Sequence, residues 1–405
     1  MLKKIKSSLI WPVSWAVMPV SVVWLLCQLV RHLPKYRWAE HIFHNVFMGN
    51  FGGYVTSTQI ARRHHGGKNV LLTFLYEPGS THNLKIGAIY HDVRILMLRK
   101  PCLTFSVGKR KFRFPSDELF IPVKEAVSQW FMSVFAPRAT FQPYAALMFG
   151  QKEPPGFRGV MPENYVEKYA GTPQATIYAN IWWEGYFERE WEDPFMPKLR
   201  LPEPLRQEIH EKLKAVRHGR AARLCMSYNK FEEVADYVRQ GSTIEDYLPA
   251  VRMLVARGYQ VLLVGDRTLD WAQMDEFDGM VVDAASLDVE KDLFRLFAPT
   301  EADICIGDAG AGMILPEVVG MPTLVLNYYP FGIGSPGKWV YPKMYKDAAG
   351  NTVPYERVMK EDLYGIYEPE RKEPLLISPI CNSREEITEA VECFLEDVAS
   401  PSDEA

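Results

Sequence analysis

The second half of the chain alternates between short apolar runs and helical patterns that have one apolar face. The apolar runs are residues 224–228, 260–264, 280–283, 303–306 and 323–326. Successive parallel strands need a crossover of a dozen or more residues, usually a helix, so this alternation constrains the fold more than any other feature. It predicts a doubly wound sheet of parallel strands.

Capping residues mark two helices in this half. Ser242 and Glu245 have the spacing of a capping box, in which each side chain accepts a hydrogen bond from the other residue's backbone amide. The helix that begins there is predicted to end at Gly258, because glycine readily adopts the conformation that closes helices. Ser383 and Glu386 form a second capping box ahead of an apolar helical stripe.

The first half contains the same kind of strand in a less regular pattern. Residues 70–76, VLLTFLY, form an apolar run that ends in a Glu-Pro-Gly-Ser turn, and the runs 95–98 and 103–107 follow. A buried strand followed by a turn is typical of an α/β unit. The 405 residues exceed the roughly 100–200 of one domain. We therefore expect two Rossmann-like lobes, at residues 60–200 and 205–399, with a cleft between them.

An uncharged segment of 22 residues, 9–30, precedes the first lobe. A helix of that length would cover a hydrocarbon core of about 30 Å, and its tryptophans suit a bilayer interface. Pro12 and Pro19 would kink such a helix, and basic residues flank it on both sides. The long apolar run and the missing cleavage site disfavour a signal peptide. We predict that residues 1–40 associate with a membrane, either spanning it or lying in one leaflet; a buried N-terminal helix is the alternative.

Charge is distributed unevenly along the chain. Residues 1–68 hold nine Lys and Arg against one acid, Glu40, a formal charge of +8, whereas the other 337 residues hold 37 basic and 49 acidic side chains, a charge of −12. A basic start on an acidic body disfavours nucleic acid as a partner and favours anionic headgroups near the N-terminus. The six cysteines include no Cys-x-x-Cys pair, so we expect neither a disulfide framework nor a metal site.

The segment 303–328, DICIGDAGAGMILPEVVGMPTLVLNY, carries the most informative motif. An apolar strand ends at Gly307, and Gly310 and Gly312 allow a tight turn beside a ligand. The helix that follows would present free amides and its positive dipole end to a phosphate, at the edge where ligands bind open parallel sheets. A tight turn without a ligand is the plain alternative.

The spacing Gly-x-x-x-x-Glu-x-x-Gly-x-Pro resembles the nucleotide-sugar half of GT-B glycosyltransferases and of nonhydrolysing nucleotide-sugar epimerases. In those families the glycines approach the donor pyrophosphate and the glutamate contacts the ribose hydroxyls. The resemblance implies that Gly310, Ala311 and Gly312 contact the phosphates and that Glu317 contacts the ribose.

A closer resemblance covers most of residues 197–399. The motifs IEDYLPA at 244–250, RGY at 257–259, VGD at 264–266, PTLVLN at 322–327 and YPK at 341–343 are similar to those of a bacterial glycosyltransferase family found with surface-polysaccharide genes, itself distantly similar to fucosyltransferase-type enzymes. The chain departs from that family at residues 227–230, SYNK in place of His-x-Arg, and at 86–88, IGA in place of Ile-Gly-His. Lys230 or Arg239 would then supply positive charge for the pyrophosphate, and His82 an imidazole.

Glycosyl transfer passes through an oxocarbenium-like transition state while negative charge grows on the departing diphosphate. The site therefore needs positive charge or amides at the diphosphate and a base for the acceptor hydroxyl. The chain has no Asp-x-Asp motif, which fits a metal-independent GT-B enzyme with a nucleotide-sugar as substrate and no cofactor. The candidate bases are Glu77 and His82, at the exit of the first predicted strand. The candidate donor-binding residues are Lys230, Arg239, Gly265, Asp266, Gly307, Asp308, Gly310, Ala311, Gly312, Glu317 and Asn327.

These observations predict a membrane-associated glycosyltransferase at the cytoplasmic face of the inner membrane. It would move a hexosyl-type sugar from a nucleotide-sugar donor to a glycan or lipid-linked acceptor. Two alternatives stay open. A noncatalytic GT-B-like scaffold in polysaccharide assembly is favoured by the missing Arg and His, whereas a nucleotide-sugar epimerase shares the glycine and glutamate pattern but leaves the apolar N-terminus unexplained.

Overall fold

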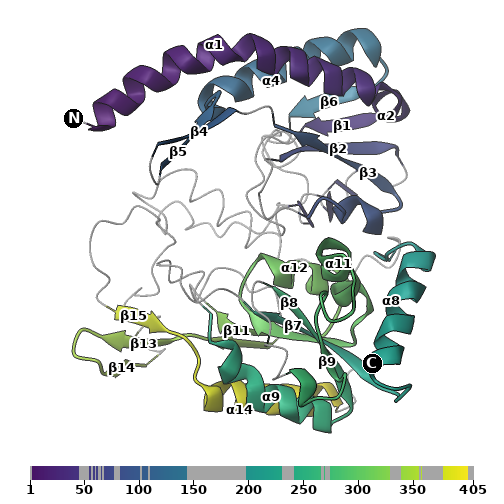
Figure 1. Cartoon of the computed structure of the whole chain (residues 1–405), viewed down its shortest axis with the longest axis vertical. Coiled ribbons are helices and arrows are strands. Elements are labelled where there is room, and N and C mark those ends of the chain that lie inside the picture. Colours follow the sequence, from purple (N-terminus) through teal and green to yellow (C-terminus); the bar gives the residue numbers. More distant parts are fainter. Residues whose placement is uncertain are drawn as a thin grey trace. The chain divides into compact units, whose positions relative to one another are not determined.

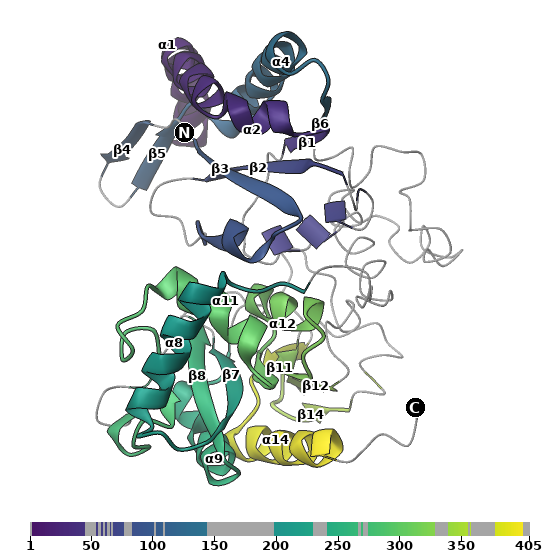
Figure 2. The same ribbon diagram turned by 90° about the vertical axis from the view of Figure 1, so that its right-hand side faces the viewer.

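The computed structural model divides into two compact units, Met1–Gly156 and Phe157–Ala405. The described residues are 2–44, 54, 55, 58, 59, 61, 62, 65, 68–76, 83–100, 103–107, 110–143, 198–229, 241–265, 269, 274–328, 339–354, 357 and 377–399. Each unit is a parallel β-sheet with helices packed on it (Figures 1 and 2). The two α/β sheets agree with the predicted fold class.

The second unit contains a six-stranded sheet in which every pairing is parallel. Its strands are β7 (Arg223–Asn229), β8 (Tyr259–Gly265), β9 (Val281–Val282), β10 (Ile304–Asp308), β11 (Thr323–Tyr328) and β12 (Trp339–Pro342). Their spatial order is β12-β11-β10-β7-β8-β9, so the chain starts in the middle, winds outward to β9 and returns to place β10 on the other side of β7. The predicted doubly wound sheet is confirmed, and β12 is an additional strand.

Helices cover both faces of this sheet. α9 (Ile244–Ala256) and α14 (Arg384–Ala399) lie on one face, and α8 (Glu203–Val216), α11 (Lys291–Glu301) and α12 (Ile314–Val318) lie on the other (Figures 1 and 2). The core on the α9 and α14 side joins Val251 and Leu254 of α9, Val391 of α14 and Ile306 of β10. A small antiparallel sheet of β13 (Met344–Asp347), β14 (Thr352–Val353) and β15 (Ile377–Ile380) completes the described part of the unit.

Two of the predicted helix ends are confirmed. Gly258 follows the last turn of α9 with φ of 84°. At the start of α14, the Ser383 amide donates to the Glu386 carboxylate at 2.7 Å, and the Glu386 amide donates to the Ser383 hydroxyl at 3.3 Å. Local sequence therefore determines these two ends.

The start of α9 differs from the prediction by one residue. The capping box is formed by Thr243 and Asp246, where the sequence predicts Ser242 and Glu245. The reason is tertiary: Ser242 is buried, and its hydroxyl donates to the carbonyl oxygen of Asn382 at 2.7 Å, next to α14. Thr243 is then the first residue whose side chain is free to cap the helix.

The first unit is built on a four-stranded parallel sheet in the order β3-β2-β1-β6. The strands are β1 (His41–His44), β2 (Val70–Tyr76), β3 (Val93–Arg99) and β6 (Thr140–Pro143). The predicted strand at 70–76 is confirmed, and the apolar run 95–98 lies within β3. The run 103–107 is β4 (Leu103–Val107), which pairs antiparallel with β5 (Arg110–Phe114). The central strand β1 has no counterpart among the predicted strands.

Three helices pack on one face of this sheet: α1 (Leu2–Arg31), α2 (Leu33–Trp38) and α4 (Asp117–Phe135). The uncharged N-terminal segment forms most of α1, and Pro12 and Pro19 lie inside the helix without ending it. Leu25 and Leu29 are fully buried against β2 and β3. The stretch Trp11–Arg31 is long and apolar enough to cross a membrane, and 28% of its most apolar window is buried. One side of α1 is thus part of the core of the first unit, and the other side is exposed.

Candidate functional site

The order of the second sheet reverses between its neighbouring strands β7 and β10. Ligands of open parallel sheets bind at the carboxyl ends of the strands at such a switch point, because the loops that leave the two central strands diverge there. β7 ends at Asn229 and β10 ends at Asp308, so the glycine motif begins at this edge. The topology therefore brings the predicted donor motif to the position where the fold is suited to bind a ligand.

Tyr228 occupies the space that two of the motif glycines leave. A Cβ atom added at Gly307 would overlap the Tyr228 backbone, and one added at Gly312 would overlap the Tyr228 ring. Glycine is therefore required at both positions for packing against Tyr228. The packing against Tyr228 explains why glycine stands at these two positions, and contact of the turn with a donor stays a prediction.

The predicted helix after the glycine turn is present and short. Ala311–Met313 forms a 3-10 turn, and α12 has only five residues. Fewer aligned peptide units give a smaller dipole, so the helix contributes less to binding a phosphate than a long helix would. Most of the positive charge for a diphosphate must then come from side chains.

Glu317, on α12, is a buried carboxyl group without a partner. The residue is 7% exposed, and neither carboxyl oxygen has a hydrogen-bond partner among the described residues. Burial raises the pKa of Glu317 to about 10, so the side chain is a neutral acid at pH 7. Glu317 lies near Cys305 of β10. The pKa of the Cys305 thiol is raised mainly by burial, then by Cys225 and then by Glu317. Glu317 therefore has unused capacity to accept hydrogen bonds beside a central strand.

A network of buried hydrogen bonds joins the ends of β10 and β11 to the starts of α9 and α14. Asp308 Oδ1 accepts from the Tyr247 hydroxyl at 2.8 Å and from Asn327 Nδ2 at 2.6 Å. Asn327 Nδ2 also donates to Ser242 Oγ at 3.0 Å. The backbone amides of Asn327 and Asn382 each donate to the other's side-chain oxygen at 2.6 Å. Buried polar groups that are all paired favour one arrangement of the chain. This network therefore fixes the backbone at the carboxyl edge of the second sheet, where β10 and β11 end.

The network accounts for two of the predicted donor-binding residues. Asp308 is completely buried and Asn327 is 2% exposed, and Asn327 holds the left-handed φ of 52°. Their side chains are committed to internal hydrogen bonds that position the loops, and direct contact with a donor stays a prediction. Gly265, at the end of β8, has φ of 122°, and its carbonyl oxygen accepts from Arg295 Nη2 at 2.8 Å.

Five predicted site residues lie outside the described residues: Glu77, His82, Lys230, Arg239 and Asp266. Glu77 follows directly in the chain after β2, and Lys230 follows directly after β7. Both segments therefore begin at the carboxyl edge of a parallel sheet. The catalytic roles of Glu77 and His82 stay predictions.

Four side chains of this edge were not predicted: Tyr228, Ser242, Tyr247 and Asn382. Tyr247 lies in the motif IEDYLPA, and Tyr228 lies in SYNK, where the chain departs from the family it resembles. Tyr228 and Tyr247 therefore lie in segments that the sequence analysis had already singled out. Nothing in the local sequence of Asn382 indicates its partner Asn327, which lies 55 residues away in the chain.

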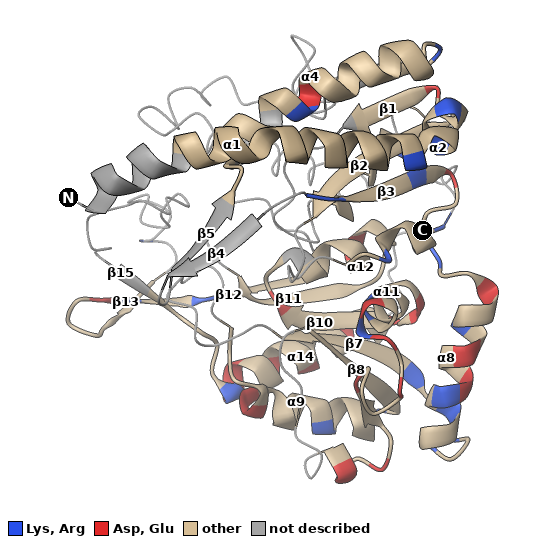
Figure 3. Ribbon diagram, turned by 45° about the horizontal axis from the view of Figure 1, so that its top comes forward, with Lys and Arg blue, Asp and Glu red and all other residues tan. Residues whose placement is uncertain are grey.

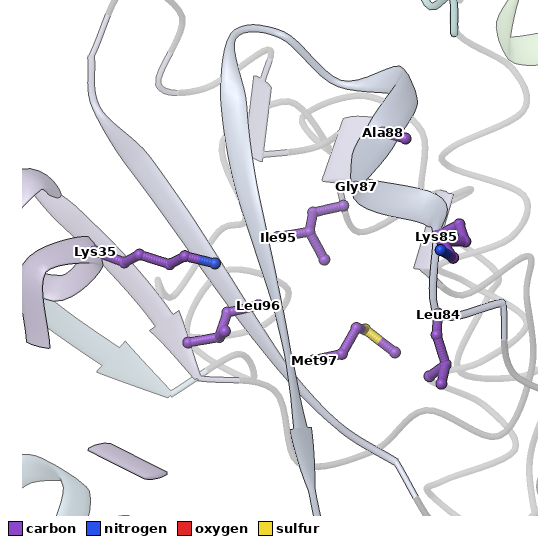
Figure 4. A pocket seen from close by; sticks show the side chains of 8 residues that line it. All are labelled: Lys35, Leu84, Lys85, Gly87, Ala88, Ile95, Leu96 and Met97. Carbon is purple, nitrogen blue, oxygen red and sulfur yellow. The ribbon is translucent and has the colours of Figure 1, made fainter. Parts of the chain in front are cut away.

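The first unit has an open pocket of about 380 Å³ beside β3 and the 3-10 turn Ile86–Ile89 (Figure 4). Its lining residues are Lys35, Leu84, Lys85, Gly87, Ala88, Ile95, Leu96 and Met97. They offer two ammonium groups and apolar surface but no carboxylate or imidazole, so the pocket itself supplies no general base. Across the described part of the chain, no three His, Cys, Asp or Glu side chains gather as metal ligands would.

No protein-family model matches the chain, and no curated protein matches it. The solved structures similar to it include a glycosyl transferase family 9 protein from Veillonella parvula DSM 2008, with 14% identity and a TM-score of 0.46 over 88% of this chain and 98% of that chain. E. coli ADP-heptose LPS heptosyltransferase II has 10% identity and a TM-score of 0.45 over 89% and 100% of the two chains. The wall teichoic acid polymerase TagF has 11% identity and a TM-score of 0.30 over 98% and 93%. By name, the first two are glycosyltransferases and the third is a polymerase of wall teichoic acid. At these identities and TM-scores the function of this chain is inferred from its own site.

Proposed function

We propose that this chain is a metal-independent glycosyltransferase of the GT-B type. The nucleotide-sugar donor binds at the switch point of the second sheet, and a glycan or lipid-linked acceptor binds the first unit. A hexosyl-type sugar is transferred in bacterial surface-polysaccharide synthesis, at the cytoplasmic face of the inner membrane, to which the N-terminus attaches the protein.

The observation that supports this proposal is the buried carboxyl group of Glu317, which has no hydrogen-bond partner among the described residues and lies five residues after Gly312 in the segment that leaves the switch-point strand β10. Buried polar groups are nearly always paired, and an unpaired one destabilises a fold by about 1–3 kcal/mol or more. A ligand that pairs with Glu317 accounts for its place here. The ribose of a nucleotide presents two adjacent hydroxyl donors, which match the two free oxygens of one carboxylate.

The chemistry of the departing diphosphate assigns roles to the neighbouring segments. The short α12 supplies little positive potential, so we assign the neutralisation of the diphosphate to Lys230 and Arg239, in the segment between β7 and α9. Glu77 and His82, in the segment after β2, are the proposed bases for the acceptor hydroxyl.

Calorimetric titration of the full chain with UDP-, GDP-, ADP- and CDP-sugars at several pH values tests the donor site. Hydroxyl donors stabilise the ionised carboxylate, whereas the free side chain has a pKa of about 10. Binding near pH 8 is therefore expected to release a proton, and affinity should rise with pH up to about 10. Glu317→Gln should abolish the proton release and weaken binding roughly tenfold or more.

The matched control is Glu389→Gln, an exposed glutamate of α14, which should leave affinity and proton release unchanged. If none of the nucleotide sugars binds the native chain at any pH, the transferase proposal is refuted.

A noncatalytic scaffold is the second candidate, and the position of Tyr228 favours it. Its backbone and ring take up the space at Gly307 and Gly312 that a donor pyrophosphate would approach. In a scaffold, the native chain would bind no donor, while Tyr228→Ala would open the turn and create binding. In a transferase, the native chain already binds the donor, and Tyr228→Ala only changes the affinity of that binding.

A further inference from the structure

Helix α1 lacks the polar outer side of a helix at the surface of a water-soluble protein. The side that faces the unit carries Ser14, Met18, Ser21, Leu25 and Leu29, which are all buried. The exposed side carries Trp15, Val20, Val23, Trp24 and Val30, whereas Trp11 is exposed but lies on the same stripe as Ser14 and Met18, three and seven residues further along. A helix at a protein–water boundary would place its serines outside and its tryptophans inside.

The polar side chains of α1 bond to the protein. The Ser14 hydroxyl oxygen accepts from the Ser116 amide at 3.0 Å, at the start of α4. The Gln28 side chain accepts from the Arg99 amide and donates to the Arg99 carbonyl oxygen, both at 2.9 Å. Over the described side chains of residues 11–30, the exposed positions then carry only the tryptophan N–H groups and the Cys27 thiol as side-chain hydrogen-bonding groups.

Helix α4 extends the exposed apolar surface. α1 and α4 run side by side on one face of the sheet (Figures 1 and 2). The Ser14–Ser116 hydrogen bond joins them near the start of α4. Near the end of α4, Arg37 Nε donates to the Phe135 carbonyl oxygen at 3.1 Å. Trp130, Val134 and Phe135 are exposed on α4. We call these eight residues the α1–α4 apolar face: Trp15, Val20, Val23, Trp24, Val30, Trp130, Val134 and Phe135, each between 37% and 69% exposed.

Positive charge borders this face. Arg31, Lys35 and Arg37 are exposed where α1 ends and α2 begins, and residues 1–39 contain no Asp or Glu. The acids of α4, Asp117, Glu118 and Glu125, stand in its first half, whereas the exposed residues of its apolar face are in the last turns. Tryptophans at a polar–apolar boundary beside Lys and Arg are the side chains that a bilayer with anionic headgroups attracts.

A spanning arrangement does not fit these contacts. Ser14 to Leu29 cover about 22 Å of helix axis, and the buried side chains of that stretch face the first unit. Placing α1 across the bilayer would carry α4 and the edge of the sheet into hydrocarbon, where exposed loops and unpaired strand edges are not tolerated. A helix that lies flat needs only one apolar side, which is what α1 has.

We propose that the α1–α4 apolar face lies in the plane of a single leaflet of an anionic bilayer, as a two-helix surface and not as a membrane span. The inference deepens the membrane attachment in the proposed function. It does not depend on the donor site, because the binding test below contains no nucleotide.

Sedimentation of the full chain with preformed vesicles tests the proposal. Vesicles of phosphatidylcholine with phosphatidylglycerol should bind the native chain, and the double variant Trp15→Gln/Trp24→Gln should bind at least tenfold more weakly. Arg31→Gln and Lys35→Gln should each weaken binding by roughly fivefold, and only on the anionic vesicles. Leu84→Gln, which changes a residue 44% exposed and outside the face, is the matched control and should bind as the native chain does.

Depth-dependent quenching separates a flat helix from a spanning one. Trp15 and Trp24 are nine residues apart, about 14 Å along the axis, and lie on the two flanks of the exposed side. In a flat helix, Trp15→Phe and Trp24→Phe should remove equal shares of the quenching by lipids brominated near the headgroup. Unequal shares, with one tryptophan quenched by deeply brominated lipids, would overturn the flat arrangement.

Two further results would overturn the proposal. Vesicle binding that survives the double tryptophan variant would show that another surface binds lipid. A native chain that ignores vesicles but forms a dimer, which the same variant dissociates during gel filtration, would assign the face to a second copy. Melting curves of each variant confirm folding, since exposed substitutions change stability by only about 0.5 kcal/mol.

Discussion

The two units build similar sheets but present different outer surfaces. In each sheet the chain starts at a central strand, adds strands on one side of it and then places later strands on the other side. In the second unit, α8 carries Lys, Arg and Glu along its length, whereas α1 of the first unit has no charged residue over residues 11–30 (Figure 3). Packing against a sheet determines the residue types on only one side of a helix. The opposite side reflects the solvent, which we infer to be water for α8 and lipid for α1.

The largest expected effect tests whether α1 belongs to the first unit. Leu25→Ala and Leu29→Ala should each destabilise that unit by about 2–5 kcal/mol, because both side chains are fully buried and leave cavities. Val23→Ala, on the exposed side of the same helix, should change stability by no more than about 0.5 kcal/mol. Hydrogen exchange of β2 amides in detergent-free buffer measures this. Equal, small effects at all three positions would mean that α1 is only an attachment.

The next effect is a difference in how the stability of the two units depends on pH. Burial lowers the pKa of Lys124, on α4, to about 7, and burial raises the pKa of Glu317 to about 10. Folded Glu317 keeps a proton that the unfolded chain loses above about pH 4.5, so stability of the second unit should fall as pH rises toward 10. Folded Lys124 loses a proton that the unfolded chain keeps up to about pH 10.5, so stability of the first unit should rise with pH above about 7.

These slopes can reach about 1.4 kcal/mol per pH unit for each group. Hydrogen exchange between pH 6 and 9, read separately on β2 and β8 after correction for the intrinsic exchange rate, should show slopes of opposite sign. Glu317→Gln should flatten the slope of the second unit only, and Lys124→Met that of the first only. Slopes of the same sign in both units would contradict the assignment.

The smallest effect compares two buried tyrosine hydroxyls. Tyr247→Phe should destabilise the second unit by about 1–3 kcal/mol, because the hydroxyl donates to Asp308 inside the buried network. Tyr36→Phe, in the first unit, should be neutral or slightly stabilising, since its buried hydroxyl has no partner among the described residues. Chemical denaturation of both variants measures the difference, and a larger loss for Tyr36→Phe would contradict it.

Local patterns were sufficient to predict five of the six strands of the second sheet, all except β12. Each of its predicted strands is a short apolar run, and the helix ends at Gly258 and Ser383 depend on neighbours within four residues. In the first unit, β1 is missing from the prediction because it has only four residues, and polar His41 and His44 enclose its two apolar ones. Its place in the sheet comes from pairing with β2 and β6, which no local pattern reveals.

The site was predicted by motif but not by geometry. The sequence identifies the glycine turn and Glu317, since both lie in one short segment. It could not show that Tyr228 fills the space at Gly312 or that Asn382 binds Asn327, because these contacts join distant parts of the chain. On α1, Ser14 and Gln28 read as polar interruptions of a membrane helix, whereas in the structure they form its protein-facing side.

The bond between Ser14 and Ser116 also has a consequence for the order of events during synthesis. The two residues are 102 positions apart, and a ribosome adds about 5–20 residues per second. The inner side of α1 must therefore wait about 5–20 s for α4 to be made. Until β2, β3 and then α4 have been made, the nascent chain carries an apolar helix that a bilayer or a chaperone can cover. The chain thus has time to reach the membrane before its first sheet is complete.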